Sequence, residues 1–290
     1  MALRTRKVSK VPQDLTKAPY YQAALSMNDL TVIETCTHTE GKKGTMLLED
    51  HLLLFVLDGK YTVRFGDQEF TVRKNEMVLL QKSIVVEFEK SGEEESNYLL
   101  NYMMFFLKEE LITEFIKMAD LQNAYPAAIV PISISAVNDR LVSYIESLKP
   151  YFKEPEQVED GLVKVKLLEL LFDVANANEK FLFQFFMLKR KERKNITEVI
   201  EENITNPVSL NDLAYLSGRS LSSFKRDFQA IYNTSPLQWI RNRRLDMAKE
   251  LLTHSSLSVT DACFSTGFEN AAHFSKVFKE RFGYSPSSLK

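Results

Sequence analysis

The sequence is short of several residue types that mark special classes of protein. Its 290 residues include two cysteines, Cys36 and Cys263, too few for a disulfide framework or a four-cysteine zinc site. No uninterrupted apolar run exceeds six residues, the length of Leu52–Leu57, whereas a membrane span needs about 20. The opening MALRTRKVSK lacks the apolar stretch of a secretory signal peptide. We therefore expect a cytoplasmic globular protein with no membrane partner.

The net charge is small, but it is unevenly distributed. The whole chain carries a formal charge of −2, and its 44% of apolar residues is enough to build buried cores. Residues 190–290 hold 15 Lys and Arg against 11 Asp and Glu, so this part is +4 and residues 1–189 are −6. At about 150 residues per domain the length predicts two domains. The charge asymmetry suggests that these two domains have different partners.

A strand-like pattern runs over residues 31–107. Short apolar or alternating segments are separated by turn signals such as Asp58-Gly59, Gly66-Asp67 and Ser91-Gly92. The segments recur at a spacing of roughly ten residues, which predicts an antiparallel β-barrel or sandwich.

The pattern changes to helical spacing after Lys108. Residues 111–118, 137–148 and 162–174 carry apolar residues three or four apart, which predicts helices. The third helix is apolar enough to need burial against the β-domain or another subunit. The aromatic and then basic FLFQFFMLKRKERK marks a domain boundary. We expect an N-terminal arm over residues 1–30, a β-barrel domain with flanking helices over 31–180, a linker over 181–194 and an all-α domain over 195–290.

The last hundred residues contain an internal repeat. Residues 210–218 read LNDLAYLSG and residues 259–267 read VTDACFSTG. Further on, residues 224–236 read FKRDFQAIYNTSP and residues 274–286 read FSKVFKERFGYSP. The offset is 49 at first and 50 after one inserted residue. Self-similarity of this kind indicates two copies of one supersecondary unit.

Each copy carries the same four signals in the same order. They are an N-cap serine with Asp three residues later, a turn glycine, a second N-cap, and two phenylalanines four residues apart. In the two copies they are Ser209 and Ser258, Gly218 and Gly267, Ser220 and Asn270, and Phe224-Phe228 and Phe274-Phe278. Together they predict a helix, a tight turn and a second helix, which is the helix-turn-helix plan.

The exposed face of each second helix favours nucleic-acid binding. The first copy offers Ser222, Ser223, Lys225, Arg226 and Gln229, and the second offers Ala271, Ala272, His273, Ser275, Lys276 and Lys279. Small residues allow close approach to a groove of DNA, and basic and amide side chains read base edges or hold phosphates. An ordinary solvated helix face would mix both signs of charge, whereas the acids here are Asp227 and Glu280.

A helical segment, LQWIRNRRLDMAKELL, joins the two copies. Its apolar spacing extends over about 16 residues, which gives a rigid strut about 24 Å long. A strut of this scale can place two recognition helices in successive major grooves, about 34 Å apart on one face of DNA. Arg241, Arg243 and Arg244 on this strut could touch phosphates or, equally, pair with Asp246 and Glu250 on the same helix.

These motifs resemble the DNA-binding domain of the AraC/XylS family of bacterial transcription regulators. The resemblance covers residues 195–290 and lies in SLNDLAYLSGRSLSSFKRDFQ, SPLQWIRNRRLDMAKELL and GFENAAHFSKVFKERFGYSP, the last being the family's signature stretch. The chain ends in PSSLK, where the family usually has an aromatic residue and Arg after the Pro. The resemblance implies base reading by Ser222, Lys225, Arg226, Ala271, Ala272, His273 and Lys276. We expect phosphate contacts from Ser223, Ser275, Arg241, Arg243 and Lys279.

The N-terminal part fits the same family. Many members carry a cupin-like β-barrel followed by dimerising helices, and HLLLFVLDGKYTVRFGDQEFTVRKNEMVLLQK resembles such a barrel. It is also weakly similar to the ExsA type, regulators of type III secretion that partner proteins control. The resemblance implies an α+β two-domain protein, with a cupin-like barrel, flanking helices and two helix-turn-helix units joined by a long helix. It further implies binding to promoter DNA, homodimerisation through the helices of residues 137–175, and activation through contact with RNA polymerase.

Two forms of control remain open for the N-terminal domain. A small-molecule effector could lie among Phe55, Phe65, Phe70, Met77 and Phe88, although inward aromatic residues also simply fill a core. Lys42, Lys43 or Lys60 could pair with an acidic effector. A partner protein could instead bind the acidic Glu93–Glu95 or the helix over residues 162–174.

A metal-dependent cupin enzyme is the remote alternative. Such a site needs His and Glu ligands clustered on neighbouring strands. Only His38 and His51 lie in the β-rich part, and no His-x-His pair occurs. We therefore expect no metal, no cofactor and no enzymatic activity.

Overall fold

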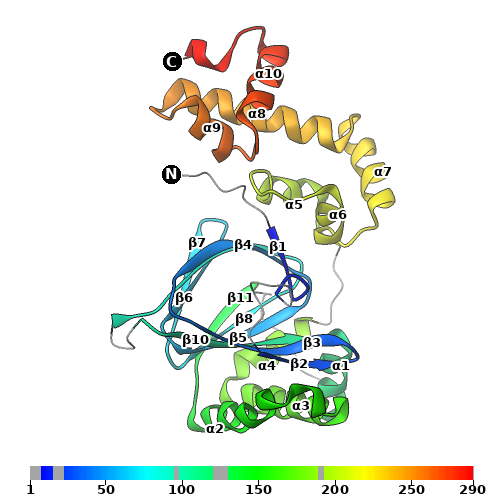
Figure 1. Ribbon diagram of the computed structural model, residues 1–290. Coiled ribbons are helices and arrows are strands. Elements are labelled where there is room, and N and C mark those ends of the chain that lie inside the picture. Colours follow the sequence, from blue (N-terminus) through cyan, green and yellow to red (C-terminus); the bar gives the residue numbers. More distant parts are fainter. Residues whose placement is uncertain (1–7, 16–22, 95–97, 120–129, 189–192, 290) are drawn as a thin grey trace. The chain divides into compact units, whose positions relative to one another are not determined.

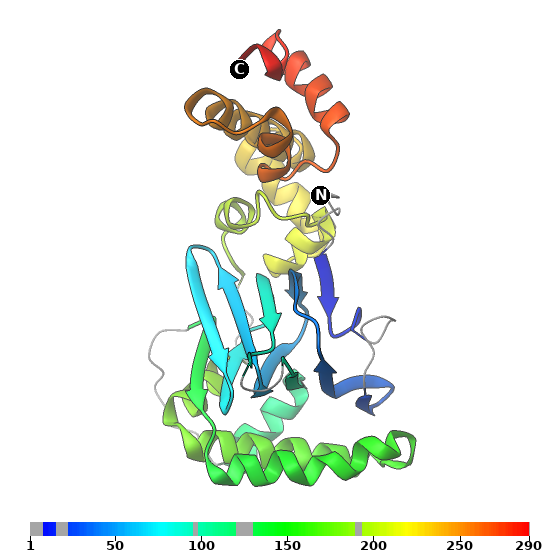
Figure 2. The same ribbon diagram turned by 60° about the vertical axis from the view of Figure 1, so that its left-hand side comes forward.

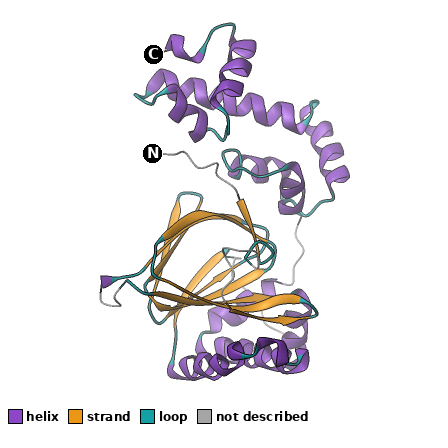
Figure 3. Cartoon of the chain, viewed as in Figure 1, coloured by secondary structure: helices purple, strands orange, loops and turns teal. Residues whose placement is uncertain are grey.

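The computed structural model describes residues 8–15, 23–94, 98–119, 130–188 and 193–289. The chain divides into two compact units, Ser9–Lys191 and Glu192–Lys290, and each has its own core. The first unit contains two β-sheets and a group of helices, and the second is built of helices (Figure 3). Over the part of the chain that is described, no helix combines the length and the apolar character that crossing a membrane requires.

The strands of the first unit form two sheets, with the orders β1-β4-β9-β6-β7 and β11-β8-β5-β10-β3-β2 (Figure 1). The five-stranded sheet contains β1 (Val8–Val11), β4 (Lys42–Leu48), β6 (Lys60–Phe65), β7 (Gln68–Arg73) and β9 (Val85–Ser91). The six-stranded sheet contains β2 (Ala23–Met27), β3 (Leu30–His38), β5 (His51–Asp58), β8 (Glu76–Leu80), β10 (Leu100–Leu107) and β11 (Ile132–Ala136). The central pairs, β5 with β10 and β5 with β8, are antiparallel.

Strand β5 shows that both faces of the six-stranded sheet are buried. Leu52 and Leu54 point between the two sheets, where they share a core with residues of the five-stranded sheet. Leu53 and Phe55 point to the opposite face and pack against helices. Because successive side chains of a strand point to opposite faces, a strand buried on both sides requires an unbroken apolar run. This requirement explains the six apolar residues Leu52–Leu57.

Helices cover the outer face of the six-stranded sheet (Figure 2). They are α1 (Glu109–Met118), α2 (Asp139–Leu148), α3 (Asp160–Ala177) and α4 (Glu179–Leu188). The apolar helix α3 buries Val163, Leu167 and Leu171 in the core that it shares with this sheet. Packing within the chain therefore accounts for most of the apolar character that the sequence shows over residues 162–174.

The expected α+β architecture is confirmed, and the strands are arranged as two facing sheets and not as one closed barrel. Three strands were not predicted: β1 and β2 fall within residues 1–30, where we expected an arm, and β11 lies just before the helix expected over residues 137–148. All three stand at the edge of a sheet and are four or five residues long. An edge strand has one neighbour and is partly exposed, so its sequence need not alternate strongly.

The described part of the second unit contains α5 (Ile196–Glu202), α6 (Leu210–Leu216), α7 (Leu221–Tyr232), α8 (Pro236–His254), α9 (Val259–Ser265) and α10 (Ala271–Phe282). Helix α8 serves two cores. Near its start, Trp239 packs against Phe228 and Tyr232 of α7. Further along, Leu245 and Leu252 enter a core with α9 and α10. With 19 residues, α8 is about 28 Å long.

Candidate nucleic-acid interface

The two helix-turn-helix units form as the repeat predicts, α6 with α7 and α9 with α10. Ser209 and Ser258 accept hydrogen bonds from the backbone three residues later and cap α6 and α9. Gly218 and Gly267 have φ values of +68° and +82°, in the left-handed region that a side chain disfavours. The predicted caps and glycine turns are therefore confirmed in both copies.

The second helices of the two units, α7 and α10, are anchored in the same way. Ser220 and Asn270 cap their N-termini through side-chain oxygens. Two fully buried phenylalanines anchor the inner face of each helix, Phe224 with Phe228 and Phe274 with Phe278. A helix that is fixed at its start and along one face presents the opposite face in a defined orientation, as base reading requires.

The outer faces of α7 and α10 correspond position by position. Exposed residues related by the 50-residue offset are Ser222 and Ala272, Arg226 and Lys276, and Gln229 and Lys279. Their spacing of four and three residues places them in one stripe along each helix. Beside the stripes, Lys225 and His273 are exposed, and Ser223, Ala271 and Ser275 are half-buried. The residues of α7 and α10 that we expected to contact DNA all reach the surface.

The acidic residue of α7 does not cancel the positive charge of this surface. Asp227 is held by Arg219, whose Nε lies 3.2 Å from its Oδ2. Arg226 reaches the other carboxylate oxygen at 3.5 Å, and its side chain remains 79% exposed. The exposed face of α7 is therefore net basic, which favours the approach of phosphates.

Two of the three arginines of α8 are engaged within the unit. Arg243 pairs with Glu201 of α5, with 3.3 Å between Nε and Oε1. Arg244 donates hydrogen bonds to three backbone carbonyls. Neither makes the pair with Asp246 that the sequence allowed, because Asp246 pairs with Arg281 of α10 at 2.7 Å. Arg243 can contact a phosphate only at the expense of its pair with Glu201.

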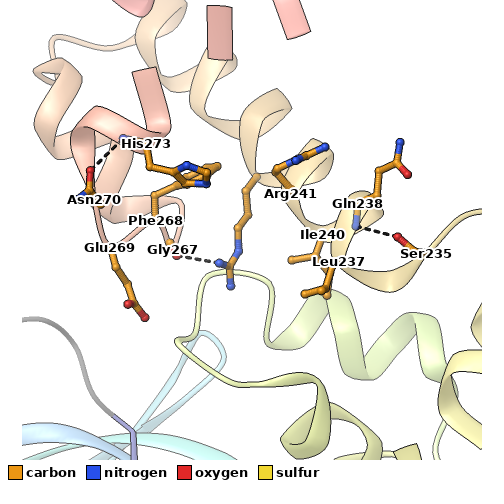
Figure 4. A pocket seen from close by; sticks show the side chains of 11 residues that line it. Ser235, Leu237, Gln238, Ile240, Arg241, Gly267, Phe268, Glu269, Asn270 and His273 are labelled. Carbon is orange, nitrogen blue, oxygen red and sulfur yellow. Dashed lines mark hydrogen bonds between the residues drawn. The ribbon is translucent and has the colours of Figure 1, made fainter. Parts of the chain in front are cut away.

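An open groove of about 670 Å³ lies between the first half of α8 and the turn that leads into α10. Gln238 and Arg241 line it from α8, and Asn270 and His273 line it from the opposite side (Figure 4). Glu269 is the acidic residue of the lining. The groove thus brings together two residues that we expected to contact DNA, Arg241 and His273.

The structure does not gather the five expected effector residues around one cavity. Phe55 and Met77 lie in the core between the six-stranded sheet and the helices. Phe65, Phe70 and Phe88 pack against the other core, between the two sheets. The sequence could not show which of the two cores Phe55 enters. In the all-apolar strand β5, residues on either face look equally suited to burial.

A buried polar cluster, Glu34, Cys36, Lys90 and Tyr102, lies between the two sheets. Glu34 accepts a hydrogen bond from the Cys36 thiol at 3.1 Å on Oε1, and its Oε2 has no partner among the described residues. The Lys90 ammonium contacts the hydroxyl of Tyr102 and lies 3.4 Å from Nε2 of His38. None of the ion pairs that the described residues form includes Lys90. Burial raises the pKa of Glu34 to about 7 and lowers the pKa of Lys90 to about 8.

His38, which lies 3.4 Å from the Lys90 ammonium, links the polar cluster to a pocket at the surface. Thr37, His38, Thr39 and Glu40 line a shallow pocket there, with a volume of about 300 Å³. The sequence analysis considered Lys42, Lys43 and Lys60 as partners for an acidic effector and missed Lys90. The sequence does contain a signal for its burial. Val86, Phe88 and Lys90 are alternate residues of β9 and so share one face of the strand, and Val86 and Phe88 belong to the core between the sheets.

Both parts of the chain are similar to domains of known transcription regulators. A family model described as a helix-turn-helix domain matches residues 213–290, and one described as the ExsA N-terminal regulatory domain matches residues 51–186. The chain is 22% identical to the HTH-type transcriptional regulator ExsA of Pseudomonas aeruginosa over 232 residues, 80% of this chain and 83% of ExsA. It is 26% identical to the virulence regulon transcriptional activator VirF of Yersinia enterocolitica over 170 residues, 58% of this chain and 61% of VirF.

Among solved structures, a transcriptional regulator of Chromobacterium violaceum with an AraC-type DNA-binding domain is 30% identical. The match covers 32% of this chain and 84% of that one, with a TM-score of 0.31.

The chain therefore combines a helix-turn-helix DNA-binding domain with an N-terminal regulatory domain of the ExsA type, and its relatives are transcriptional regulators of the AraC family. The similarity of the N-terminal part to the ExsA type, seen in the sequence, is confirmed.

Replacement of Lys279 by alanine tests whether the end of the α10 stripe holds a phosphate. Each phosphate neutralised by a lysine releases condensed counterions, which adds about 0.9 to the slope of log K against log salt concentration. We expect Lys279→Ala to reduce this slope by about one when binding to duplex DNA is measured between about 50 and 200 mM salt. An unchanged slope would remove Lys279 from the phosphate contacts.

Proposed function

We propose that this protein activates transcription from promoters that it binds through α7 and α10. The observation that carries the proposal is the pair of matching exposed stripes on these helices, whose charged members, Arg226, Lys276 and Lys279, are all basic. The relative VirF is named a transcriptional activator, which supports the direction of the effect. RNA polymerase is the partner that activation implies. We place the protein in the cytoplasm and assign it no catalysed reaction, since the relatives are named as regulators.

The proposal is tested by mapping bound promoters in the native host and measuring transcripts with and without the gene. We expect discrete bound promoters whose transcripts fall when the gene is removed. A strain that carries Lys225→Glu with Arg226→Glu is the matched control, and it should lose both the binding and the transcripts. Transcripts that rise at bound promoters would make the protein a repressor. A lack of discrete bound promoters would contradict DNA reading by these helices.

We also propose that the protein forms a homodimer through α2 and α3, within residues 137–175. These two helices pack on each other, and apolar side chains remain at their surface. Val142, Leu162 and Val165 are 41%, 39% and 59% exposed. Large exposed apolar side chains on two helices that pack on each other support an interface at this surface.

Replacement of Val165 by glutamate tests this interface. In a symmetric dimer each substitution acts twice, and burying a Val is worth about 1.5–3 kcal/mol, so we expect dimer dissociation to rise by at least tenfold. Sedimentation velocity of the full-length protein measures the change. Arg73→Glu, on β7 of the other sheet, is the control and should leave the oligomeric state unaltered. A dimer of unchanged strength in Val165→Glu would place the interface elsewhere.

For the N-terminal unit we propose control by a small molecule with an acidic group, bound at the buried polar cluster. Support comes from Lys90, a buried ammonium that makes no ion pair with the described residues, next to a surface pocket. A native mass spectrum of the full-length protein from its host should show added mass, which Lys90→Met should lose. A wild-type protein without added mass would favour the alternative, control by a partner protein.

A further inference from the structure

Arg244, in the middle of α8, binds three backbone carbonyls at once. Its Nε donates to the oxygen of Ile204 at 2.6 Å, its Nη1 to Gly267 at 2.8 Å and its Nη2 to Asn206 at 3.0 Å. Burial lowers the pKa of this guanidinium from its ordinary value. Among the described residues, no carboxylate lies within ion-pair distance of it. A half-buried cation that binds only carbonyls loses part of its hydration without gaining an ion pair, so the planar geometry of the guanidinium is its main contribution here.

The three carbonyls belong to two segments that are far apart in the sequence. Ile204 and Asn206 lie in the loop that leads from α5 into α6, just before the first helix-turn-helix unit. Gly267 is the turn glycine of the second helix-turn-helix unit, between α9 and α10, and Figure 4 shows the hydrogen bond that its carbonyl accepts. Arg244 itself stands on the helix that joins the units. The planar side chain of Arg244 therefore connects three parts of the DNA-binding domain: the loop before α6, the joining helix α8 and the turn of the second helix-turn-helix unit.

The loop between α5 and α6 passes very close to the turn between α9 and α10. A Cβ atom placed on Gly267 would lie 2.9 Å from the carbonyl oxygen of Thr205 and 3.0 Å from Cζ of Arg244. The absence of a side chain at Gly267 is thus required for the contact between the units as well as for the turn. This close approach leaves the two units little room to shift against each other.

Two other arginine pairs link the same parts of the domain, Arg243 with Glu201 and Arg281 with Asp246. Their side chains are between 31% and 41% exposed, and ion pairs of this kind contribute about 0–1 kcal/mol. Arg244 differs because it is half-buried and its planar fork matches three backbone acceptors at fixed angles, with no carboxylate partner among the described residues. It is the contact best suited to define how the first unit is oriented relative to the second.

We propose that Arg244 is a positioning residue that sets the spacing between the two DNA half-sites read by α7 and α10. The inference rests on DNA reading by both helices, as proposed above. Recognition helices in successive major grooves require half-sites about 10–10.5 base pairs apart, so one extra base pair turns the second half-site by about 34°. When Arg244 fixes the two helix-turn-helix units relative to each other, they cannot follow this rotation of the second half-site. When Arg244 is replaced, the units can rotate against each other and accept neighbouring spacings.

The test is a selection of duplex DNA from a random library, with the full-length protein and its variants. The wild type should enrich two half-motifs at a single spacing. Arg244→Gln should enrich the same half-motifs over at least three spacings, with the preference for the best spacing reduced about tenfold. Arg244→Lys keeps the charge and loses the planar fork, so it should also broaden the spacing. Lys249→Gln removes one charge from the same helix and should keep the single spacing.

The outcomes separate this inference from the proposed function. Half-motifs that remain enriched show that α7 and α10 still read DNA, so a broadened spacing reports on positioning and not on unfolding. A single spacing of wild-type sharpness in both Arg244 variants would overturn the inference while leaving DNA reading intact. If Arg244→Gln does not fold, Arg244→Lys decides the question alone. A wild type that enriches no pair of half-motifs would overturn the proposed function and this inference together.

Discussion

Gly267→Ala is expected to lower the melting temperature of the DNA-binding unit by about 10–20 °C, corresponding to about 3 kcal/mol in a unit of about 100 residues. Two causes add. Gly267 has φ = +82°, a conformation that costs an alanine about 1–2 kcal/mol. Its new Cβ would also lie 2.9 Å from the carbonyl oxygen of Thr205, a backbone atom that cannot move alone. Overpacking of this kind typically costs about 1–3 kcal/mol.

Gly283→Ala is the matched control for this prediction. Gly283 has φ = +83°, and nothing lies within 4 Å of the position that its Cβ would occupy. This variant should therefore lose about 1–2 kcal/mol from the backbone conformation alone. Scanning calorimetry of the full-length protein separates the two effects. Equal losses in the two variants would show that the contact between Gly267 and Thr205 imposes no steric limit.

Arg226→Ala is expected to weaken binding to the selected DNA by about 1–3 kcal/mol, or up to about 150-fold in the dissociation constant. Arg226 stands at the centre of the exposed stripe on α7, and its side chain is 79% exposed. Its contacts within the protein are long, 3.4 Å to Oγ of Ser223 and 3.5 Å to Oδ1 of Asp227. The guanidinium can therefore leave them for the paired acceptors of a guanine at little cost.

Comparison of two duplexes distinguishes base reading from attraction to phosphate. For a base-reading arginine, the loss on the selected duplex should exceed the loss on a scrambled duplex of equal length. Lys117→Ala, which removes one exposed positive charge from α1, should change neither affinity measurably. Equal losses of Arg226→Ala on both duplexes would assign the residue to the phosphate backbone.

The sequence predicted the two helix-turn-helix units well because its signals are local. A capping serine, a glycine with positive φ and two phenylalanines four residues apart each act within a single turn or helix. Their repetition at offsets of 49 and 50 made the interpretation firm. The short helix α5 was not predicted, although Asn195 caps it through a hydrogen bond from the backbone of Thr197 at 2.8 Å. Its seven residues provide too few turns to show a clear period.

The roles of individual arginines and of the core aromatics could not be predicted, because they depend on which elements pack together. Arg243 and Arg244 are neighbours in the sequence, yet one pairs with a surface carboxylate and the other binds three backbone carbonyls. Phe55 and Phe65 looked alike until the helices were seen to cover one face of one sheet. Charge and hydrophobicity are properties of residues, whereas these roles are properties of contacts between distant segments.

Helix α8, which enters the cores of both helix-turn-helix units, has a consequence for how the domain opens. Trp239 packs in the core of the first helix-turn-helix unit, and Leu245 and Leu252 pack in the core of the second. Because all three residues belong to α8, unfolding of either unit would expose part of the helix that the other unit packs against. We expect amide protons in α7 and α10 to exchange with solvent through one cooperative opening of common free energy. What the sequence shows as two copies is then a single folding unit, and a truncation between the copies would yield no stable half.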